Sequence, residues 1–259
     1  MLLPASTERR KVIVLNIDLI RYNNAITSII ALGRAKQAGY ACFVNAHMAI
    51  EAYKKKTFSQ AVNAATFLFA DGMPIVKVLR LFYGVKQDRI AGMDFMPSII
   101  KACAENELSV FLFGSTPDVL SAIESRLRIL YPAFKIAGRI SPSFNEFSEE
   151  EAESYVKQIN GSNANLVLVG MGCPKQETWM AKYSERINAP LLGVGGAFAV
   201  FAGLKRRAPK WMQKLSLEWL YRLIQEPKRM WKRYLFTNTL FIFLIIKEWL
   251  QGRAKDRSI

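Results

Sequence analysis

Short apolar runs alternate with amphipathic stretches along most of the chain. Seven apolar runs are typical of strands, and they lie near residues 11–17, 40–44, 66–70, 109–113, 135–139, 165–169 and 190–194. Most of the stretches between them have helical periodicity. Repeated alternation of strand and helix predicts an α/β fold with a mainly parallel sheet flanked by helices. Ligands bind such open sheets beside the carboxyl ends of the strands, so candidate chemistry is sought there first.

The sixth run leads into a glycine turn. Residues 166–177 read LVLVGMGCPKQE, which predicts a buried strand, a sharp turn at Gly170 and Gly172, and a helix start that suits the proline. A helix start offers unpaired amides and a positive dipole end to an anion, and Lys175 and Gln176 add a charge and an amide. The segment therefore predicts a phosphate site, although an ordinary strand-to-helix connection has the same local pattern.

Polar residues follow other apolar runs. Asn45 comes directly after the second run, where it could cap the next helix or hydrogen-bond a ligand. Asp71 and Gly72 follow the third run, and Asp94 precedes an apolar helical stretch. Aspartate is a preferred helix cap, and capping is the more common role for both aspartates. Of the two, Asp71 is the stronger candidate for catalysis.

Glycines also follow the last run, where Gly195 and Gly196 permit close backbone approach to a ligand or to another strand. No two of the six Asp residues are spaced as DxD, which argues against a metal-bound nucleotide-sugar site of that kind. The three cysteines are far apart, and the single histidine, His47, completes no familiar zinc spacing with them. We therefore predict a reduced compartment and no structural metal.

The carboxyl-terminal part of the chain is strongly basic. Of the net charge of +15, residues 205–259 carry +10, from 14 Lys or Arg and 4 Asp or Glu. Basic residues alternate there with aromatic ones, and the apolar run 234–246 is shorter than the roughly 20 residues of a spanning helix. We interpret the tail as a basic amphipathic helical appendage that lies on an anionic membrane surface. The alternatives are a helix that packs on its own domain or on a second copy, which would make a homo-oligomer.

Six motifs in order carry a resemblance to a known family. They are residues 45–47 (NAH), 70–74 (ADGMP), 92–94 (GMD), 170–177 (GMGCPKQE), 193–198 (GVGGAF) and 207–212 (RAPKWM). In this order they resemble the WecG/TagA/CpsF family of bacterial glycosyltransferases, and residues 217–229 match the family's characteristic ending. The resemblance implies a Rossmann-like core over residues 1–204 and a membrane-associating segment over residues 205–259 that also completes the active site.

The implied reaction is an inverting, metal-independent and cofactor-free glycosyl transfer in surface polysaccharide synthesis. A hexose or N-acetylhexosamine would move from a UDP-sugar to a sugar on undecaprenyl diphosphate, at the cytoplasmic face of the bacterial inner membrane. The short apolar run near the amino terminus lacks the pattern of a signal peptide, which also favours the cytoplasm.

The resemblance also implies residue roles. Asp71 would be the base that takes the acceptor proton, and Asn45 would lie near the reacting groups. Where many members have a threonine, this chain has Phe43, so any role of that hydroxyl is absent or displaced. The residues expected to bind the substrates are Gly72, Asp94, Gly170, Gly172, Lys175, Gln176, Gly195, Gly196, Arg207, Arg222 and Arg229.

Two other classes of function are compatible with parts of the sequence. A basic, aromatic tail also suits a nucleic-acid-binding α/β protein without catalysis, but no RNA-binding signature accompanies it. A nicotinamide-dependent oxidoreductase would need GxGxxG at the first strand-to-helix turn, and this chain has no such motif there. We therefore expect no nucleic-acid partner.

Overall fold

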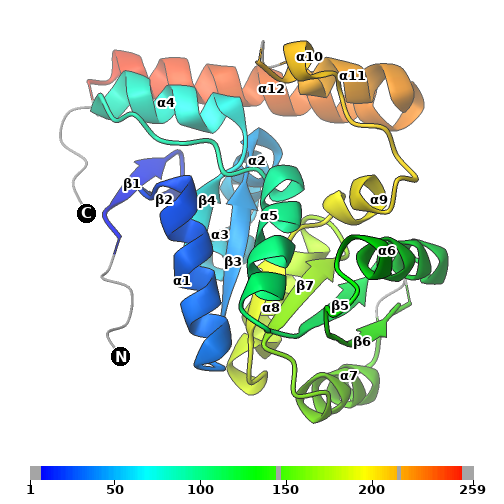
Figure 1. The fold of residues 1–259 in the computed structure, drawn as a ribbon. Helices are drawn as coiled ribbons and strands as arrows, with labels where there is room; N and C mark the ends of the chain where they lie inside the picture. The colour runs from blue at the N-terminus through cyan, green and yellow to red at the C-terminus, as the bar shows by residue number, and fades with distance from the viewer. Residues whose placement is uncertain (1–6, 144–146, 215–216, 253–259) are drawn as a thin grey trace.

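A computed structural model describes residues 7–143, 147–214 and 217–252. Its centre is a sheet of six parallel strands in the order β4-β3-β8-β7-β5-β6 (Figure 1). Six of the seven predicted strands are confirmed as these elements. Their bounds are β3 Gly39–Val44, β4 Phe67–Ala70, β5 Val110–Gly114, β6 Ile136–Ile140, β7 Leu166–Gly170 and β8 Pro190–Gly193.

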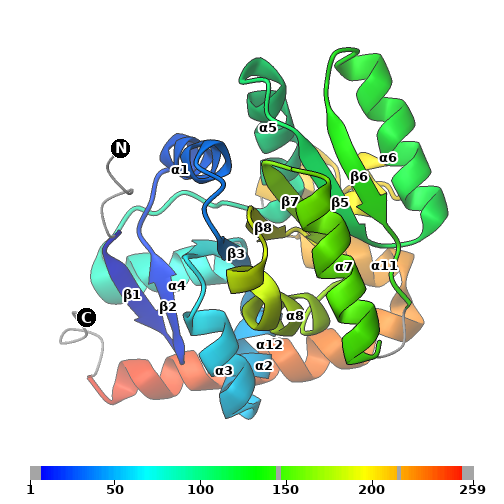
Figure 2. The ribbon, with the colours of Figure 1, turned by 90° about the horizontal axis from the view of Figure 1, so that it is seen from below.

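Helices cover both faces of the sheet, because successive side chains of its strands point to opposite faces and most are apolar. On one face lie α1 (Tyr22–Arg34), α5 (Gly92–Glu105), α6 (Pro117–Leu130) and the short α9 (Ala197–Phe201). On the other lie α2 (Ala46–Lys54), α3 (Lys56–Asn63), α4 (Met73–Tyr83), α7 (Glu149–Gly161) and α8 (Lys175–Tyr183), which a 3₁₀ turn, Ser184–Arg186, follows. Figure 2 shows the two layers on either side of the strands. The predicted α/β class is therefore confirmed.

The first predicted strand, 11–17, is wrong as a single element. The chain turns back at Ile13, whose φ is 60°, and forms an antiparallel hairpin of β1 (Arg9–Val12) and β2 (Leu15–Asp18) outside the main sheet. Both halves of the apolar run are buried, so hydropathy alone could not reveal the turn. The buried Asp18 fixes the hairpin, since its carboxylate accepts hydrogen bonds from the Leu68 amide at 2.6 Å and from Arg9 Nε at 2.9 Å.

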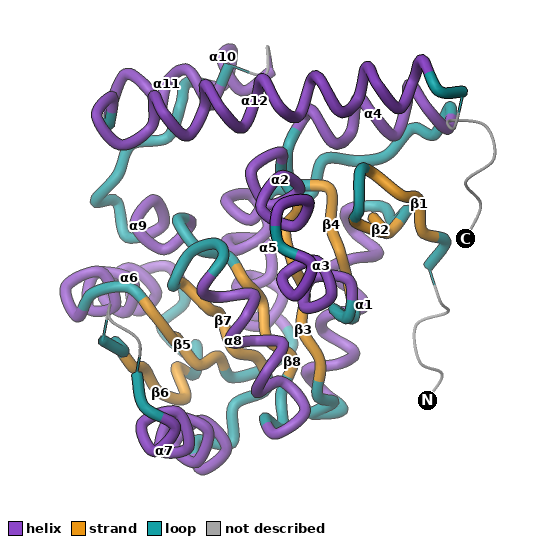
Figure 3. Tube along the Cα trace, turned by 180° about the vertical axis from the view of Figure 1, so that it is seen from behind, coloured by secondary structure: helices purple, strands orange, loops and turns teal. Residues whose placement is uncertain are grey.

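The carboxyl-terminal part contains α10 (Lys210–Lys214), α11 (Glu218–Gln225) and α12 (Pro227–Leu250). The long α12 crosses the molecule above the carboxyl ends of the strands and lies beside α2 and α11 (Figures 1 and 3). One face of α12 is buried through Phe241, Leu244 and Ile245, and each such side chain contributes about 1.5 to 3 kcal/mol. The predicted alternative of a helix packed on its own domain therefore holds for this face.

The opposite face of α12 carries exposed apolar side chains, among them Leu235, Phe236, Ile242, Phe243 and Ile246. Among the described residues, no helix combines the length and the hydropathy that a bilayer span requires. The helix therefore has one apolar face against the protein and a second apolar face in contact with solvent.

Candidate active site

A cavity of about 730 Å³ opens at the carboxyl ends of the central strands. The loops after β3, β4, β7 and β8 form its floor, and residues from α11 and α12 form its cover. This is the position at which open α/β sheets bind ligands. It brings together most of the residues predicted from sequence, namely Asn45, Asp71, Gly72, Gly172, Gln176, Gly195, Gly196, Arg207 and Arg222.

Asn45 and Asp71 meet because of strand register. Val44 of β3 pairs with Ala70 of β4, so the next residues on the two parallel strands emerge side by side. Asn45 Nδ2 lies 3.5 Å from Asp71 Oδ2, while Asn45 Oδ1 accepts a 3.2 Å hydrogen bond from the Met48 amide and caps α2. Both roles that the sequence left open for Asn45, cap and neighbour of the reacting groups, are thus compatible in one side chain.

Asp71 is not a helix cap. The N-cap of α4 is Gly72, and no side chain caps that helix. Burial raises the pKa of Asp71 to about 6, although the positive charges of Arg222 and Arg89 and the hydrogen bond from Asn45 lower it. A carboxylate with such a pKa is a stronger base than an ordinary aspartate and is still ionised at neutral pH.

Arg222 of α11 reaches into the same cavity, where its Nη2 lies 3.2 Å from Met93 Sδ at the start of α5. Among the described residues, no carboxylate lies within ion-pair distance of Arg222. Its charge is therefore available to an anion in the cavity.

A four-residue network fixes two further arginines of the cavity, Arg207 and Arg89. Arg207 makes a two-point ion pair with Asp94, with Nη2 at 2.8 Å from Oδ2, and its Nε lies 3.3 Å from Glu218. Arg89 bridges the same two carboxylates at 2.9 Å and 3.2 Å. Burial would raise the pKa of Asp94, but the hydrogen bonds and charges of Arg207 and Arg89 outweigh it and lower that pKa. We call Arg89, Asp94, Arg207 and Glu218 the arginine network.

The network changes the interpretation of Asp94. The N-cap of α5 is Ala91, and Asp94 lies in the first turn of the helix without capping it. The capping role that the sequence favoured is therefore wrong, because the two arginines take up both oxygens of the carboxylate. Asp94 does not line the cavity itself; it holds two arginines that do.

The glycine turn has the predicted shape, with β7 ending at Gly170 and α8 beginning at Lys175. Gly172 has a φ of 86°, a conformation that L side chains rarely adopt. The buried Gln176 secures it: Oε1 accepts from the Gly172 amide at 3.1 Å, and Nε2 donates to the Gly193 carbonyl at 2.8 Å. The Gln176 amide thus ties the glycine turn to the last residue of β8, and Gln176 lines the cavity with its polar atoms already engaged.

Behind Gln176 lies a buried carboxylate that the sequence did not single out. Glu177 is fully buried, and its Oε1 accepts a 2.7 Å hydrogen bond from Gln176 Nε2. Burial raises the pKa of Glu177 to about 7 against the hydrogen bonds from Gln176 and Cys173. As an acceptor at this position, Glu177 fixes which end of the Gln176 amide faces Gly172.

Two predicted substrate-binding residues, Gly170 and Lys175, lie outside the cavity. Gly170 does not line the cavity; a Cβ there would lie 2.6 Å from the Phe198 ring, so its glycine serves close packing. Lys175 does not line it either, since its Nζ donates to the Ser143 carbonyl at 3.2 Å and lies over the Phe147 ring. Arg229 is in the first turn of α12, and its side chain lies outside the described part of the structure.

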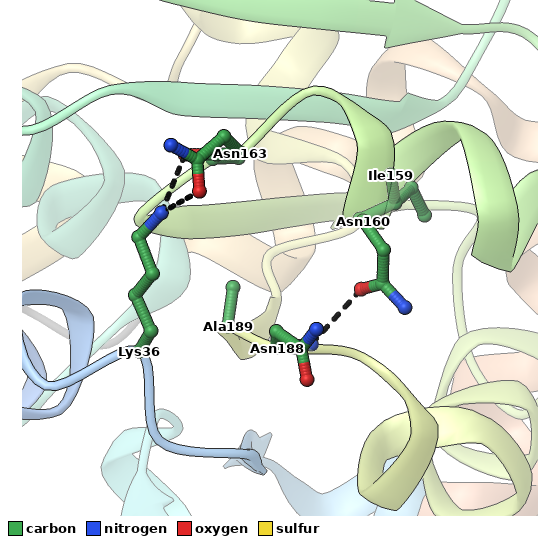
Figure 4. Close-up of a pocket in the computed structure, with 7 residues that line it drawn as sticks. Lys36, Ile159, Asn160, Asn163, Asn188 and Ala189 are labelled. Carbon is green, nitrogen blue, oxygen red and sulfur yellow. Dashed lines mark hydrogen bonds between the residues drawn. The ribbon is translucent and has the colours of Figure 1, made fainter.

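A second cavity, of about 300 Å³, lies at the amino ends of the strands (Figure 4). Lys36, Asn160, Asn163 and Asn188 line it, with Lys36 bonded to Asn163 and Asn160 to the Asn188 amide. It is at the opposite end of the strands from Asp71, and among the described residues that line it there is no carboxylate, histidine or cysteine. The larger cavity is therefore the candidate active site.

A family model described as the glycosyl transferase WecG/TagA/CpsF family matches residues 10–255. The chain belongs to this family. It is also 35% identical over 193 residues to a Bacillus subtilis protein named N-acetylglucosaminyldiphosphoundecaprenol N-acetyl-beta-D-mannosaminyltransferase. That match covers 74% of this chain and 73% of the relative. The resemblance stated from the motifs is confirmed, and the chain is a glycosyltransferase.

The cavity of this glycosyltransferase also contains Arg89 and Glu218, which the motifs alone did not mark. Arg89 lies five residues before Asp94 in a loop, and Glu218 precedes Arg222 by one helical turn, so the two share a face of α11. These two short spacings, Arg89 to Asp94 and Glu218 to Arg222, are the sequence signals that could have placed Arg89 and Glu218 at the site. Phe43 lines the cavity but is buried against Phe69 and Phe95, with ring centroids 5.4 Å away in both cases. No three His, Cys, Asp or Glu side chains cluster as metal ligands would within the described ranges.

Proposed function

We propose that this glycosyltransferase moves a hexose or N-acetylhexosamine from a UDP-sugar to a sugar carried on undecaprenyl diphosphate. The transfer inverts the anomeric carbon and uses neither a metal nor a cofactor. The observation that carries the proposal is Asp71, a half-buried carboxylate of raised pKa in a large cavity whose rim carries cations. Support for the substrates comes from the relative, whose name contains both an aminosugar donor group and a diphosphoundecaprenol acceptor.

In the proposed reaction, the acceptor hydroxyl oxygen attacks the anomeric carbon from the side opposite to UDP. Asp71 accepts the hydroxyl proton, and UDP leaves with the electron pair of the broken glycosidic bond. General-base assistance of this kind contributes about 10² to 10⁴ in rate. Asn45 orients the Asp71 carboxylate through the contact between their side chains.

The leaving diphosphate needs positive charge where its own negative charge develops. Arg222 is suited to this role because it faces the cavity without a carboxylate partner among the described residues. The glycine turn at Gly172, secured by Gln176, forms the opposite wall for the nucleotide. Arg207 and Arg89 serve mainly to hold α11 in place, since two carboxylates already neutralise them. In this scheme the core provides Asp71 and the glycine turn, and residues 205–259 complete the active site with Arg222.

The second apolar face of α12 supports membrane association. Exposed Phe236, Ile242 and Phe243 accompany a basic tail, a combination that binds anionic headgroups. We propose that the protein is peripheral, at the cytoplasmic face of the bacterial inner membrane, where lipid-linked acceptors are within reach of the cavity.

The decisive experiment measures sugar transfer from a panel of UDP-sugars to N-acetylglucosamine diphosphate on a short alkyl chain. UDP-N-acetylmannosamine is the first donor to test, given the relative. The expected result is transfer with inversion that persists in EDTA and that falls at least a hundredfold in Asp71→Asn, as expected for loss of a general base. Unchanged turnover in Asp71→Asn would refute the proposed base.

A further inference from the structure

Lys77 lies on the wall of the active-site cavity that α4 provides. It follows Met73 by one helical turn, and both side chains line the cavity. Lys77 is exposed, and within the described residues no carboxylate is in ion-pair distance of it. The proposed reaction assigns this cation no role.

The position of Lys77 separates it from the glycine turn. In the sheet order β4-β3-β8-β7, the strand that leads to α4 lies three strand spacings from the strand that leads to the turn, about 14 Å. A single diphosphate cannot span that distance. A donor diphosphate held beside the glycine turn therefore leaves the α4 side free for a second anion, and Asp71 lies at the end of β4 on that same side.

Apolar side chains continue outward from Lys77. Leu81, one turn further along α4, is 62% exposed, and the cavity wall on α12 includes Phe241 and the exposed Ile242. Ile246, one turn beyond Ile242, is also exposed. Both α4 and α12 lie at this edge of the molecule in Figures 1 and 3, and Figure 2 draws the two helices apart. From the floor of the cavity towards its edge, the order of groups is thus the Asp71 carboxylate, the Lys77 ammonium and the apolar side chains of α4 and α12.

We propose that Lys77 binds the diphosphate of the lipid-linked acceptor, with the acceptor sugar at Asp71 and the isoprenoid chain leaving between α4 and α12. The order of groups along a sugar, a diphosphate and a polyprenyl chain matches the order of side chains along this path. The inference rests on the proposed function and adds the site that distinguishes the acceptor from the donor.

The experiment compares Lys77→Gln with wild type in steady-state kinetics with the soluble short-chain diphosphate acceptor. We expect the KM for this acceptor to rise about tenfold, as for loss of one charge-assisted hydrogen bond, while the KM for the UDP-sugar stays within twofold. With an alkyl glycoside acceptor that lacks the diphosphate, Lys77→Gln and wild type should be equal. Arg80→Gln is the matched control, because Arg80 is exposed on the same helix and does not line the cavity.

Three results would overturn the inference: an unchanged acceptor KM, an equal loss with the phosphate-free acceptor, or an equal loss in Arg80→Gln. Each of these leaves transfer by the wild type, and with it the proposed function, intact. Calorimetry of the diphosphate acceptor without donor gives a readout that does not depend on turnover, and weaker binding to Lys77→Gln than to wild type is expected there. Absence of transfer by the wild type would instead refute the proposed function.

Discussion

Arg207 holds the carboxylate of Asp94 through two hydrogen bonds, although the two residues are 113 positions apart in the chain. This pair joins the segment before α10 to the first turn of α5. Glu218 and Arg89 close the arginine network around it, with all four side chains at least partly buried. The relationship explains how a carboxyl-terminal helix can place Arg222 in a cavity built by the strands of the core.

Loss of the Asp94 charge should weaken this attachment. In Asp94→Asn, Arg207 and Arg89 lose the charge of their shared partner. Because these ion pairs are partly exposed, we expect the free energy of unfolding to fall by only about 1 to 2 kcal/mol. The melting temperature should then be lower by roughly 2 to 4 °C. Transfer activity should fall, and hydrogen exchange in residues 217–225 should rise. The matched control is Glu105→Gln, which removes an exposed pair with Lys101 at the other end of α5 and should change neither. Equal exchange in the two variants would contradict the role of the network.

The pH dependence of kcat/KM should report Asp71. The proposed base must be ionised, and its pKa is about 6, so kcat/KM should fall tenfold per unit below that pH and level off above it. The charge of Arg222 lowers this pKa, so in Arg222→Gln the acid limb should move to higher pH. Glu177 has a raised pKa of about 7, so Glu177→Gln serves as the control and should keep the acid limb near 6.

The ionised carboxylate of Asp71 should lower the free energy of unfolding at neutral pH. Its pKa is about 6 in the folded protein and about 3.9 in an unfolded chain, so the folded state binds this proton more tightly. The associated stability is fully present below pH about 4 and is lost as the pH rises through 6. Asp71→Asn cannot ionise, and we expect it to be more stable than wild type at pH 8 by on the order of 1 to 2 kcal/mol. Chemical denaturation at pH 8 and at pH 4 tests this, since the gain should vanish at the lower pH.

Gln176 should matter more for loop geometry than for direct contact with substrate. In Gln176→Ala, the Gly172 amide and the Gly193 carbonyl both lose their partner, and we expect a loss of about 2 to 4 kcal/mol in the free energy of unfolding. Gln176→Glu keeps the acceptor for Gly172 but sets an oxygen against the Gly193 carbonyl and Glu177, so it should also be destabilised, and increasingly so as the pH rises. A pH-independent effect of Gln176→Glu would argue against this arrangement.

The two faces of α12 should respond differently to truncation. Leu244 is buried against the core and the adjacent Phe243 is 60% exposed. We expect Leu244→Ala to lower the free energy of unfolding by about 2 to 4 kcal/mol and Phe243→Ala by less than about 0.5 kcal/mol. Binding to vesicles of anionic lipid should show the reverse order, with Phe243→Ala the more impaired. Equal vesicle binding by Phe243→Ala and wild type would count against the membrane face.

The sequence by itself determined the α/β class, six of the strands, the family, and the strand-end positions of Asn45, Asp71 and Gly172. These follow from local hydropathy, turn residues and motif spacing, and each of these signals depends only on residues that are close together in the sequence. The pairing of Asn45 with Asp71, the arginine network, the engagement of Gln176 and the two faces of α12 were decided only by the tertiary structure. Strand register and side-chain direction bring together residues that are distant in the chain, and a buried environment then sets their pKa values and partners. The placement of Lys175 outside the cavity has the same cause, whereas the hairpin at Ile13 could not be predicted from hydropathy because both halves of its apolar run are buried.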